Sequence, residues 1–232
     1  MLRFALSVGL VAACHAAVPA SAGAAGRSLT TGPAMITQNT SDAITAGQSV
    51  ACPPDGPHDD NSYWRRFDLD GDHAITSCFQ VSRVDFGVEL ASAPDGSQPV
   101  WVRLHTIPNA APLTTANLTS IGSFPLSVTN QSLTIIQTPG NAIVIDPLLL
   151  DLVVEVYTPS GQDAGDLFLI GSNGLGQSAP SYLSAPDCGI AQPTDLADQG
   201  YPNMHIYMSV VGGGCSTAAP TASWGRIKTL YR

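Results

Sequence analysis

The sequence predicts an all-β domain, specifically a disulfide-stabilised β-sandwich of jelly-roll type. Short apolar runs with a two-residue period follow one another at roughly 8 to 12 residue spacing, separated by Gly- and Pro-rich turns. Residues 41–212 contain no helical period over about a dozen residues. Four of the five cysteines lie beyond the first two dozen residues, and an even number of cysteines in an exported chain indicates disulfides.

The clearest strand signal is the run from Leu150 to Tyr157. Its apolar residues at alternate positions share one side of an extended chain, while Asp151, Glu155 and Tyr157 share the other. We expect this strand and residues 167–170 to form a central hairpin, and residues 81–91 and 99–106 to form a second hairpin. Further strand candidates are residues 41–51, 62–69, 121–128, 133–137 and 204–210.

Residues 1–24 have the pattern of a secretory signal peptide. Arg3 supplies a positive n-region, Phe4 to Ala13 an apolar h-region, and Ala20 to Ala24 contain small-x-small cleavage sites. The run Val11-Ala-Ala-Cys14 also resembles a bacterial lipobox, so lipidation of Cys14 is an alternative. Either pattern predicts export, and we expect a secreted, extracellular or cell-surface protein.

Composition divides the rest of the chain. We expect a polar lead over residues 25–40, the sandwich over 41–212, a linker over 213–223 and a basic C-terminal tail over 224–232. The change from an acidic body to a basic tail suggests an appended docking or sorting element. The longest apolar run, residues 142–157, is interrupted by Asp, Pro and Glu, so no membrane span is expected.

The charge distribution excludes some partners. The formal net charge is −9, and no Lys or Arg occurs between Leu104 and Gly225. Such a surface repels phosphate backbones and anionic lipid headgroups, so we expect neither nucleic acid nor bare membrane as a partner.

The cysteines Cys52, Cys78, Cys188 and Cys215 are widely spaced and contain no CxxC pair. Two disulfides are therefore favoured over a zinc site. Three connectivities are possible, and the spacing does not choose among them.

Several short motifs together resemble an uncharacterised family of secreted bacterial β-sandwich domains. They are Asn61-Ser-Tyr-Trp-Arg65, Phe67-Asp-Leu69, Val154-Glu-Val156, Ile170-Gly-Ser-Asn173, Ala179-Pro-Ser-Tyr-Leu183, Cys188-Gly189 and Asn203-Met-His-Ile206. The resemblance covers about Cys52 to Gly212 and implies a Cys52–Cys188 bridge, which leaves Cys78 to pair with Cys215. It implies no established activity.

Two motifs raise alternatives that involve a metal or catalysis. Alternating carboxylates at Asp68, Asp70 and Asp72 are similar to the start of a calcium loop, although His73 and Phe79 stand where that loop needs Gly and Glu. A solvated turn is the alternative, and no other cofactor is expected. Glu89 and Glu155 are the two glutamates of the chain, and a glycoside hydrolase or lyase would need such a pair in one cleft.

The outward face of the second expected hairpin provides a ligand-site hypothesis. With symmetric closure, Glu89 lies opposite Trp101, Gly87 opposite Arg103 and Asp85 opposite His105. Sugar-binding sandwiches use such a mixture, because an aromatic ring stacks on a pyranose while charged groups bind its hydroxyls. The hypothesis therefore assigns ligand binding to a set of outward side chains: Trp101, Arg103, His105, Asp85, Glu89 and Tyr157. An ordinary outer face is the alternative.

These observations favour a secreted, non-catalytic binding or surface module whose ligand the sequence does not specify. A carbohydrate-binding module is the first alternative, and a glycoside hydrolase or lyase that uses Glu89 and Glu155 is the second. The expected partner is a polysaccharide or another cell-surface component.

Overall fold

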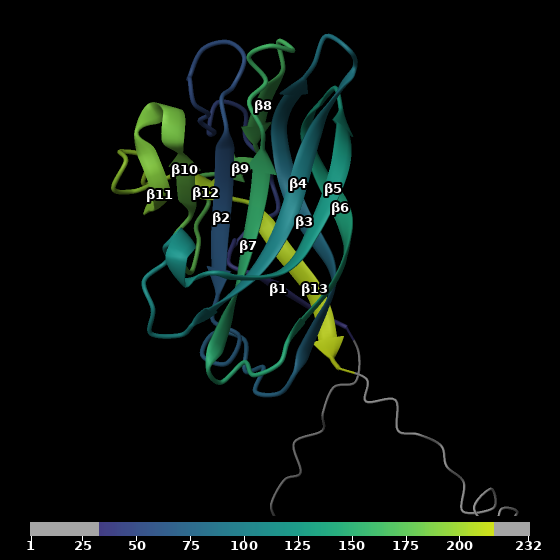
Figure 1. Cartoon of the computed structure of the whole chain (residues 1–232), viewed down its shortest axis with the longest axis vertical. Coiled ribbons are helices and arrows are strands. Elements are labelled where there is room, and N and C mark those ends of the chain that lie inside the picture. The colour runs from purple at the N-terminus through teal and green to yellow at the C-terminus, as the bar shows by residue number, and fades with distance from the viewer. Residues whose placement is uncertain (1–32, 216–232) are drawn as a thin grey trace, which may run out of the picture. The chain divides into compact units, whose positions relative to one another are not determined.

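The computed structural model describes residues 33–215. The expected signal peptide, Cys14, most of the expected linker and the basic tail lie outside this range. Two antiparallel sheets make up the described region (Figure 1). Sheet I contains, in spatial order, β1 (Ala34–Thr37), β13 (Met208–Gly214), β3 (Phe79–Ser92) and β6 (Gln131–Val144), and β8 (Leu167–Ile170) also pairs with β3.

Sheet II has the spatial order β11 (Ile190–Asp195), β10 (Tyr182–Ala185), β2 (Asn61–Phe67), β7 (Leu150–Thr158), β4 (Ser97–Pro108) and β5 (Thr119–Thr129). A small separate ladder joins β9 (Ser172–Asn173) and β12 (His205–Ile206). Two short 3-10 turns, η1 (Thr115–Asn117) and η2 (Pro186–Cys188), lie in connections at sheet II.

The strand order confirms the jelly-roll prediction. If β1 to β7 are counted as first to seventh and β13 as eighth, sheet I reads first, eighth, third, sixth and sheet II reads second, seventh, fourth, fifth. This interleaved order is that of two Greek keys rolled into a sandwich. Every connection among these eight strands therefore crosses from one sheet to the other, except the connection from β4 to β5.

The two-residue period places the core between the sheets. On β4 the inward-facing core side chains include Val100, Val102 and Leu104, and on β7 they include Leu152, Val154 and Val156. They pack in one cluster with Val84, Phe86 and Val210 from sheet I. Because successive side chains of a strand point to opposite faces, the residues between them lie on the outer faces of the sandwich.

Arg65 of β2 interrupts this apolar pattern, because it points into the protein and is fully buried. Its guanidinium donates to the carbonyl oxygens of Ile206 (2.6 Å) and Ala179 (2.8 Å) and to the side-chain oxygen of Asn39 (3.3 Å). Desolvation lowers the pKa of Arg65 to about 9. Carbonyl oxygens thus satisfy this buried cation and tie β2 to the segments around Ala179 and Ile206.

Both expected hairpins are wrong, although their strands exist. β3 lies in sheet I and β4 in sheet II. Likewise, β8 lies in sheet I and β7 in sheet II. The turns at residues 93–96 and 159–166 therefore pass between the sheets and do not close a two-stranded ladder. Asn130, at the β5–β6 junction, exchanges two hydrogen bonds with the backbone of Ala93 (2.7 and 3.0 Å). These bonds fix the β3–β4 connection to the β5–β6 connection, which also passes between the sheets.

The sandwich is longer at both ends than expected. Residues 34–37, assigned to the polar lead, form β1 and pair with β13. Gly213 and Gly214, assigned to the linker, are the end of β13 and pair with the start of β3. Residues 41–51, a strand candidate, are irregular, whereas β9, β10 and β11 were not expected.

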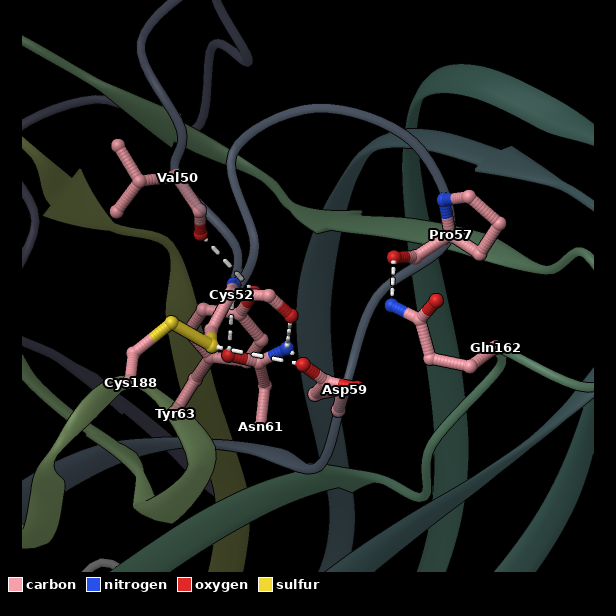
Figure 2. The surroundings of a disulfide bond; sticks show 8 residues. All are labelled: Val50, Cys52, Pro57, Asp59, Asn61, Tyr63, Gln162 and Cys188. Atoms are coloured by element: carbon pink, nitrogen blue, oxygen red, sulfur yellow. Dashed lines mark hydrogen bonds between the residues drawn. A yellow bond between two sulfur atoms is a disulfide. The ribbon is translucent and has the colours of Figure 1, made fainter.

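Two disulfides are present, Cys52–Cys188 and Cys78–Cys215. They confirm the pairing that the family resemblance implied, and they are compatible with an extracellular protein. Figure 2 shows the first bridge beside Asn61, whose side chain accepts a hydrogen bond from the backbone of Cys52 (3.1 Å) and donates to Asp59 (2.9 Å). Tyr63, in the same view, donates to the carbonyl oxygen of Val50 (3.0 Å), and burial raises its pKa.

Within residues 33–215, the structure contains no helix that is long and apolar enough to cross a membrane.

Candidate binding site

The outer face of sheet II brings several of the predicted site residues together. β2, β7 and β4 lie side by side in that order (Figure 1). Their register places Ser62, Tyr157 and Trp101 in one cross-strand row. The next row contains Trp64, Glu155 and Arg103. These rows follow from the alternation of each strand and the register between strands.

Glu155 is the centre of this face. Only 3% of the residue is exposed, yet both of its carboxylate oxygens have partners. Oε1 accepts hydrogen bonds from the hydroxyl of Ser62 (2.7 Å) and from Arg103 (3.1 Å), and Oε2 lies 3.0 Å from Nε2 of His105. Burying a carboxylate is unfavourable unless it is paired and hydrogen-bonded. The contacts with Ser62, Arg103 and His105 meet this requirement and fix these three side chains relative to Glu155.

Arg103 connects the buried carboxylate to the surface. Its side chain is 33% exposed, and the carbon of its guanidinium lies 3.9 Å from the centre of the Tyr157 ring. The Tyr157 hydroxyl donates to Asp60 at 3.3 Å. Desolvation and the neighbouring Asp60 raise the pKa of Tyr157, so its hydroxyl stays protonated and remains a donor near neutral pH.

Two other aromatic rings flank this centre. Trp101 packs against Tyr157 with ring centres 5.8 Å apart, and it is half-buried. Trp64 lies 5.7 Å from the His105 ring and donates its indole N–H to Ser184 at 3.0 Å. Trp64 is only 4% exposed, so it supports the site from below, whereas Trp101 and Tyr157 reach the surface.

Two adjacent hollows open on this face. The larger, of about 400 Å³, is bounded by strand residues on its floor and by η1 and η2 residues on its sides, including Ser62, Arg103, Glu155, Tyr157, Thr115 and Pro186. The smaller, of about 350 Å³, is bounded by Ser97, Pro99, Trp101, Pro125 and Ser127 of β4 and β5, with Gln98 and Leu126. Leu113 and Leu118 from the β4–β5 connection pack on Trp64, Ile107 and Val153. Of the two, Leu118 lines the larger hollow.

Asp85 and Glu89 do not belong to this site, so the expected opposition of Glu89 with Trp101 and of Asp85 with His105 is wrong. Both acidic residues lie on β3 of sheet I. Asp85 pairs with Arg83 through two hydrogen bonds of 2.7 and 3.0 Å. Glu89 accepts hydrogen bonds from the backbone N–H groups of Gly47 (2.7 Å) and Gln48 (3.2 Å).

Gly87 has a different role from the expected one. The ligand hypothesis used it as an opening for close approach to the backbone. The space is occupied by the protein itself, because a Cβ on Gly87 would overlap Cδ1 of Ile44 and lie 2.9 Å from Cα of Gly171. Gly87 therefore allows two backbone segments of the sandwich to approach each other.

The proposed pair of catalytic glutamates does not form. Glu155 is buried in the outer face of sheet II and Glu89 is held by the loop at Gly47 on sheet I. A glycosidase needs its two carboxyl groups on either side of one glycosidic bond. The geometry thus gives no support to a hydrolase or lyase that uses Glu89 with Glu155.

The calcium suggestion also finds no support. The Asp68 carboxylate accepts a hydrogen bond from the N–H of Gly71 (2.7 Å), three residues further along the chain, and so stabilises the local turn. Among residues 33–215, no group of three or more His, Cys, Asp or Glu side chains gathers in a way that could hold a metal ion. Asp68, Asp70 and Asp72 are therefore best described as turn residues.

Of the residues in the ligand hypothesis, Arg103, His105 and Tyr157 line the larger hollow and Trp101 lines the smaller one. The hypothesis did not include Glu155, which the sequence offered only as a catalytic candidate, or the neighbouring residues Asp60, Ser62 and Ser184 of the larger hollow. Alternation does place Ser62 and Trp64 on one side of their strand. Their proximity to Glu155 depends on β2 pairing with β7, and no local signal in the sequence indicates that pairing.

No protein-family profile matches the chain, and no curated protein matches it significantly. Among solved structures, it is similar to a clostridial cysteine protease, Cwp84, after propeptide cleavage, with a TM-score of 0.50 and 13% sequence identity. The match covers 79% of this chain and 40% of that chain. At this identity the similarity concerns the fold alone. In the described region of this chain, all four cysteines are in disulfides.

Proposed function

We propose that the protein is a secreted binding module without turnover, and that the larger hollow on sheet II is its ligand site. The observation that carries this proposal is the cluster around Glu155. A half-exposed guanidinium on a tyrosine ring, an imidazole and a buried carboxylate meet in one hollow of about 400 Å³ on a rigid sheet. Ligand sites commonly combine an aromatic surface with a few convergent polar groups.

A polysaccharide is the ligand class that fits this chemistry best. The exposed parts of the Trp101 and Tyr157 rings suit the apolar face of a pyranose, with one face of Tyr157 already covered by the Arg103 guanidinium. Arg103 and Asp60 offer a donor and an acceptor for the hydroxyls of the sugar. Both oxygens of Glu155 are occupied by donors of the protein, so this carboxylate orders the site and leaves contact with the ligand to its partners.

The site lies on strands instead of mobile loops, so the shape of the site is largely fixed before a ligand binds. β7, which carries Glu155 and Tyr157, has a neighbouring strand on each side. Preorganised side chains lose little conformational entropy when a ligand binds. Export, supported by the signal-peptide pattern and the two disulfides, would place this site outside the cell.

The proposal is tested by presenting the exported protein, with its disulfides intact, to an array of neutral and acidic glycans and by titrating any ligand found. Tyr157→Ala should lower affinity at least tenfold, which is about 1.4 kcal/mol. Tyr157→Phe keeps the ring and loses the hydrogen bond to Asp60, so it separates stacking from hydrogen bonding.

Tyr201→Ala is the matched control, because Tyr201 is an exposed tyrosine that lines neither hollow. It should bind like the wild type. Failure of the wild type to bind any glycan, or equal binding by Tyr157→Ala, would reject the polysaccharide-binding proposal.

A further inference from the structure

We infer that the two hollows on sheet II act together as one groove, which binds several consecutive sugars of a linear, uncharged polysaccharide running across the strands. This inference rests on the proposed function and makes it more specific. It concerns the length, direction and charge of the ligand.

The direction follows from a cross-strand row of side chains. Register places Pro125 of β5 opposite Trp101 of β4, and Trp101 opposite Tyr157 of β7. Adjacent strands lie about 4.8 Å apart, so these three flat side chains span about 10 Å at right angles to the strands. The row continues on β2 and β10 with the hydroxyl residues Ser62 and Ser184. A ligand that stacks on the first three residues therefore crosses β5, β4 and β7 toward β2.

The two hollows lie next to each other along this row and share no lining residue. Trp101 lines the smaller hollow and Tyr157 lines the larger one, and their ring centres are only 5.8 Å apart. The boundary between the hollows is thus a pair of aromatic rings inclined at 51° to each other, and the Arg103 guanidinium covers one face of Tyr157. A polysaccharide that occupies both hollows passes over these rings and can stack on the exposed part of Trp101. Together the hollows are about twice the size of either alone, so a ligand that fills only one of them leaves about half of the groove empty.

One end of this groove is open. β5 is the edge strand of sheet II, and Pro125 and Ser127 of β5 are exposed residues on the boundary of the smaller hollow. A ligand chain can therefore leave the groove over this edge without meeting a further strand of the sheet. The ligand can therefore be longer than the groove.

Charge selects an uncharged chain. Arg103 is the one Lys or Arg among the residues that line the two hollows, and it is 3.1 Å from Glu155. Asp60 adds a second carboxylate to the larger hollow. No Lys or Arg occurs anywhere from Leu104 to Gly225, and the net charge is −9. An acidic polysaccharide would be repelled by this surface.

The test is a size series. Calorimetric titrations would use cello-, xylo- and manno-oligosaccharides of two to six sugars, with oligogalacturonates of the same lengths as the anionic comparison. With one neutral series, affinity should rise at least tenfold between two and five sugars. Oligogalacturonates should bind at least tenfold more weakly than neutral chains of equal length.

Variants locate the extra contacts. In Trp101→Ala the gain between two and five sugars should fall below threefold, whereas Tyr201→Ala should retain it. Circular dichroism and the thermal midpoint would show that Trp101→Ala remains folded, and Trp101→Phe should recover part of the length dependence. Recovery by a smaller ring identifies stacking as the cause.

The outcomes separate this inference from the proposed function. Affinity that is the same for two and five sugars, or tighter binding of oligogalacturonates, would overturn the groove and leave polysaccharide binding in place. Length dependence that survives in Trp101→Ala would also overturn it. Failure to bind any glycan on the array would reject the proposed function itself.

Discussion

The outer faces of the two sheets have similar sequence patterns, but the protein's own chain covers these residues on sheet I and leaves them partly exposed on sheet II. On sheet I, Asp85, Gly87 and Glu89 alternate with core residues of β3, and the protein's own chain occupies them: Glu89 binds the Gly47 loop and Gly87 is covered by Ile44. On sheet II, Trp101 and Arg103 alternate with core residues of β4 and remain partly exposed beside two hollows.

The difference shows what makes a polar outward residue available to a ligand. Glu89 and Glu155 are both nearly buried, at 7% and 3% exposure. Glu89 accepts its hydrogen bonds from backbone N–H groups. By shielding these groups from solvent it stabilises a loop. Glu155 is satisfied by three side chains, Ser62, Arg103 and His105, all of which line the larger hollow. The first arrangement stabilises the protein alone, whereas the second also positions groups for binding.

Removal of each disulfide should have the largest effect on stability. Cys52–Cys188 and Cys78–Cys215 close loops with sequence separations of 136 and 137 residues. Replacing either pair by serine should lower the free energy of unfolding by about 4–5 kcal/mol, measured in urea. The first pair should also weaken ligand binding, because Cys188 belongs to η2, whose Pro186 borders the larger hollow. The second pair, on sheet I, should leave binding unchanged.

Mass spectrometry provides the control for this experiment. The non-reduced protein should be about 4 Da lighter than the reduced form, because each of the two bridges removes two hydrogens. Detection of four free thiols in the exported protein would contradict the disulfide assignment.

Glu89→Ala and Glu155→Ala compare the two faces directly. Glu89→Ala leaves the N–H groups of Gly47 and Gln48 without their acceptor, so stability should fall by about 1–3 kcal/mol with no change in ligand affinity. Glu155→Ala should reduce both stability and affinity, because Arg103 and His105 lose the carboxylate that positions them. A loss of affinity in Glu89→Ala would contradict the assignment of the site to sheet II.

Acid should destabilise the protein through buried and half-buried histidines that are not part of the site. Desolvation lowers the pKa values of His58, His73 and His205, opposed in His58 by a hydrogen bond to the Asp166 backbone. Since the folded state disfavours their protonated forms, their contribution to stability is complete above the unfolded pKa of about 6.5 and is lost as pH falls below it. The raised pKa of Asp151, caused by burial, acts in the opposite direction at more acidic pH.

Urea unfolding between pH 7.5 and 5 measures this effect. The slope of stability with pH should be smaller in His58→Asn, because His58 is 1% exposed and its Nε2 has no hydrogen-bond partner. An unchanged slope in this variant would exclude His58 as a contributor.

Trp101→Ala should have the smallest effect on stability and a specific effect on binding. Trp101 is half-buried and lies on the outer face, so the free energy of unfolding should change by less than about 1 kcal/mol. Affinity for a polysaccharide should fall at least tenfold, about 1.4 kcal/mol. Equal affinity of variant and wild type in a titration would exclude Trp101 from the site.

Local sequence determined most strands and the face to which each side chain points. The period of two on β4 and β7 correctly separates Val102 and Val154, which are buried in the core, from Arg103 and Glu155 on the outside. This succeeds because strand geometry alone places successive side chains on opposite faces. The prediction of disulfides likewise needed only the number of cysteines and the expected export.

Tertiary structure alone decided which strands are neighbours, and therefore which side chains meet. A short turn between two alternating strands is compatible with a hairpin in one sheet or a passage between two sheets, and a jelly roll repeatedly uses the second. Alternation carries no information about that choice, which depends on burying both inner faces at once. For the same reason Glu155 meets Arg103 and Ser62, 52 and 93 residues away along the chain, while Glu89 meets a loop.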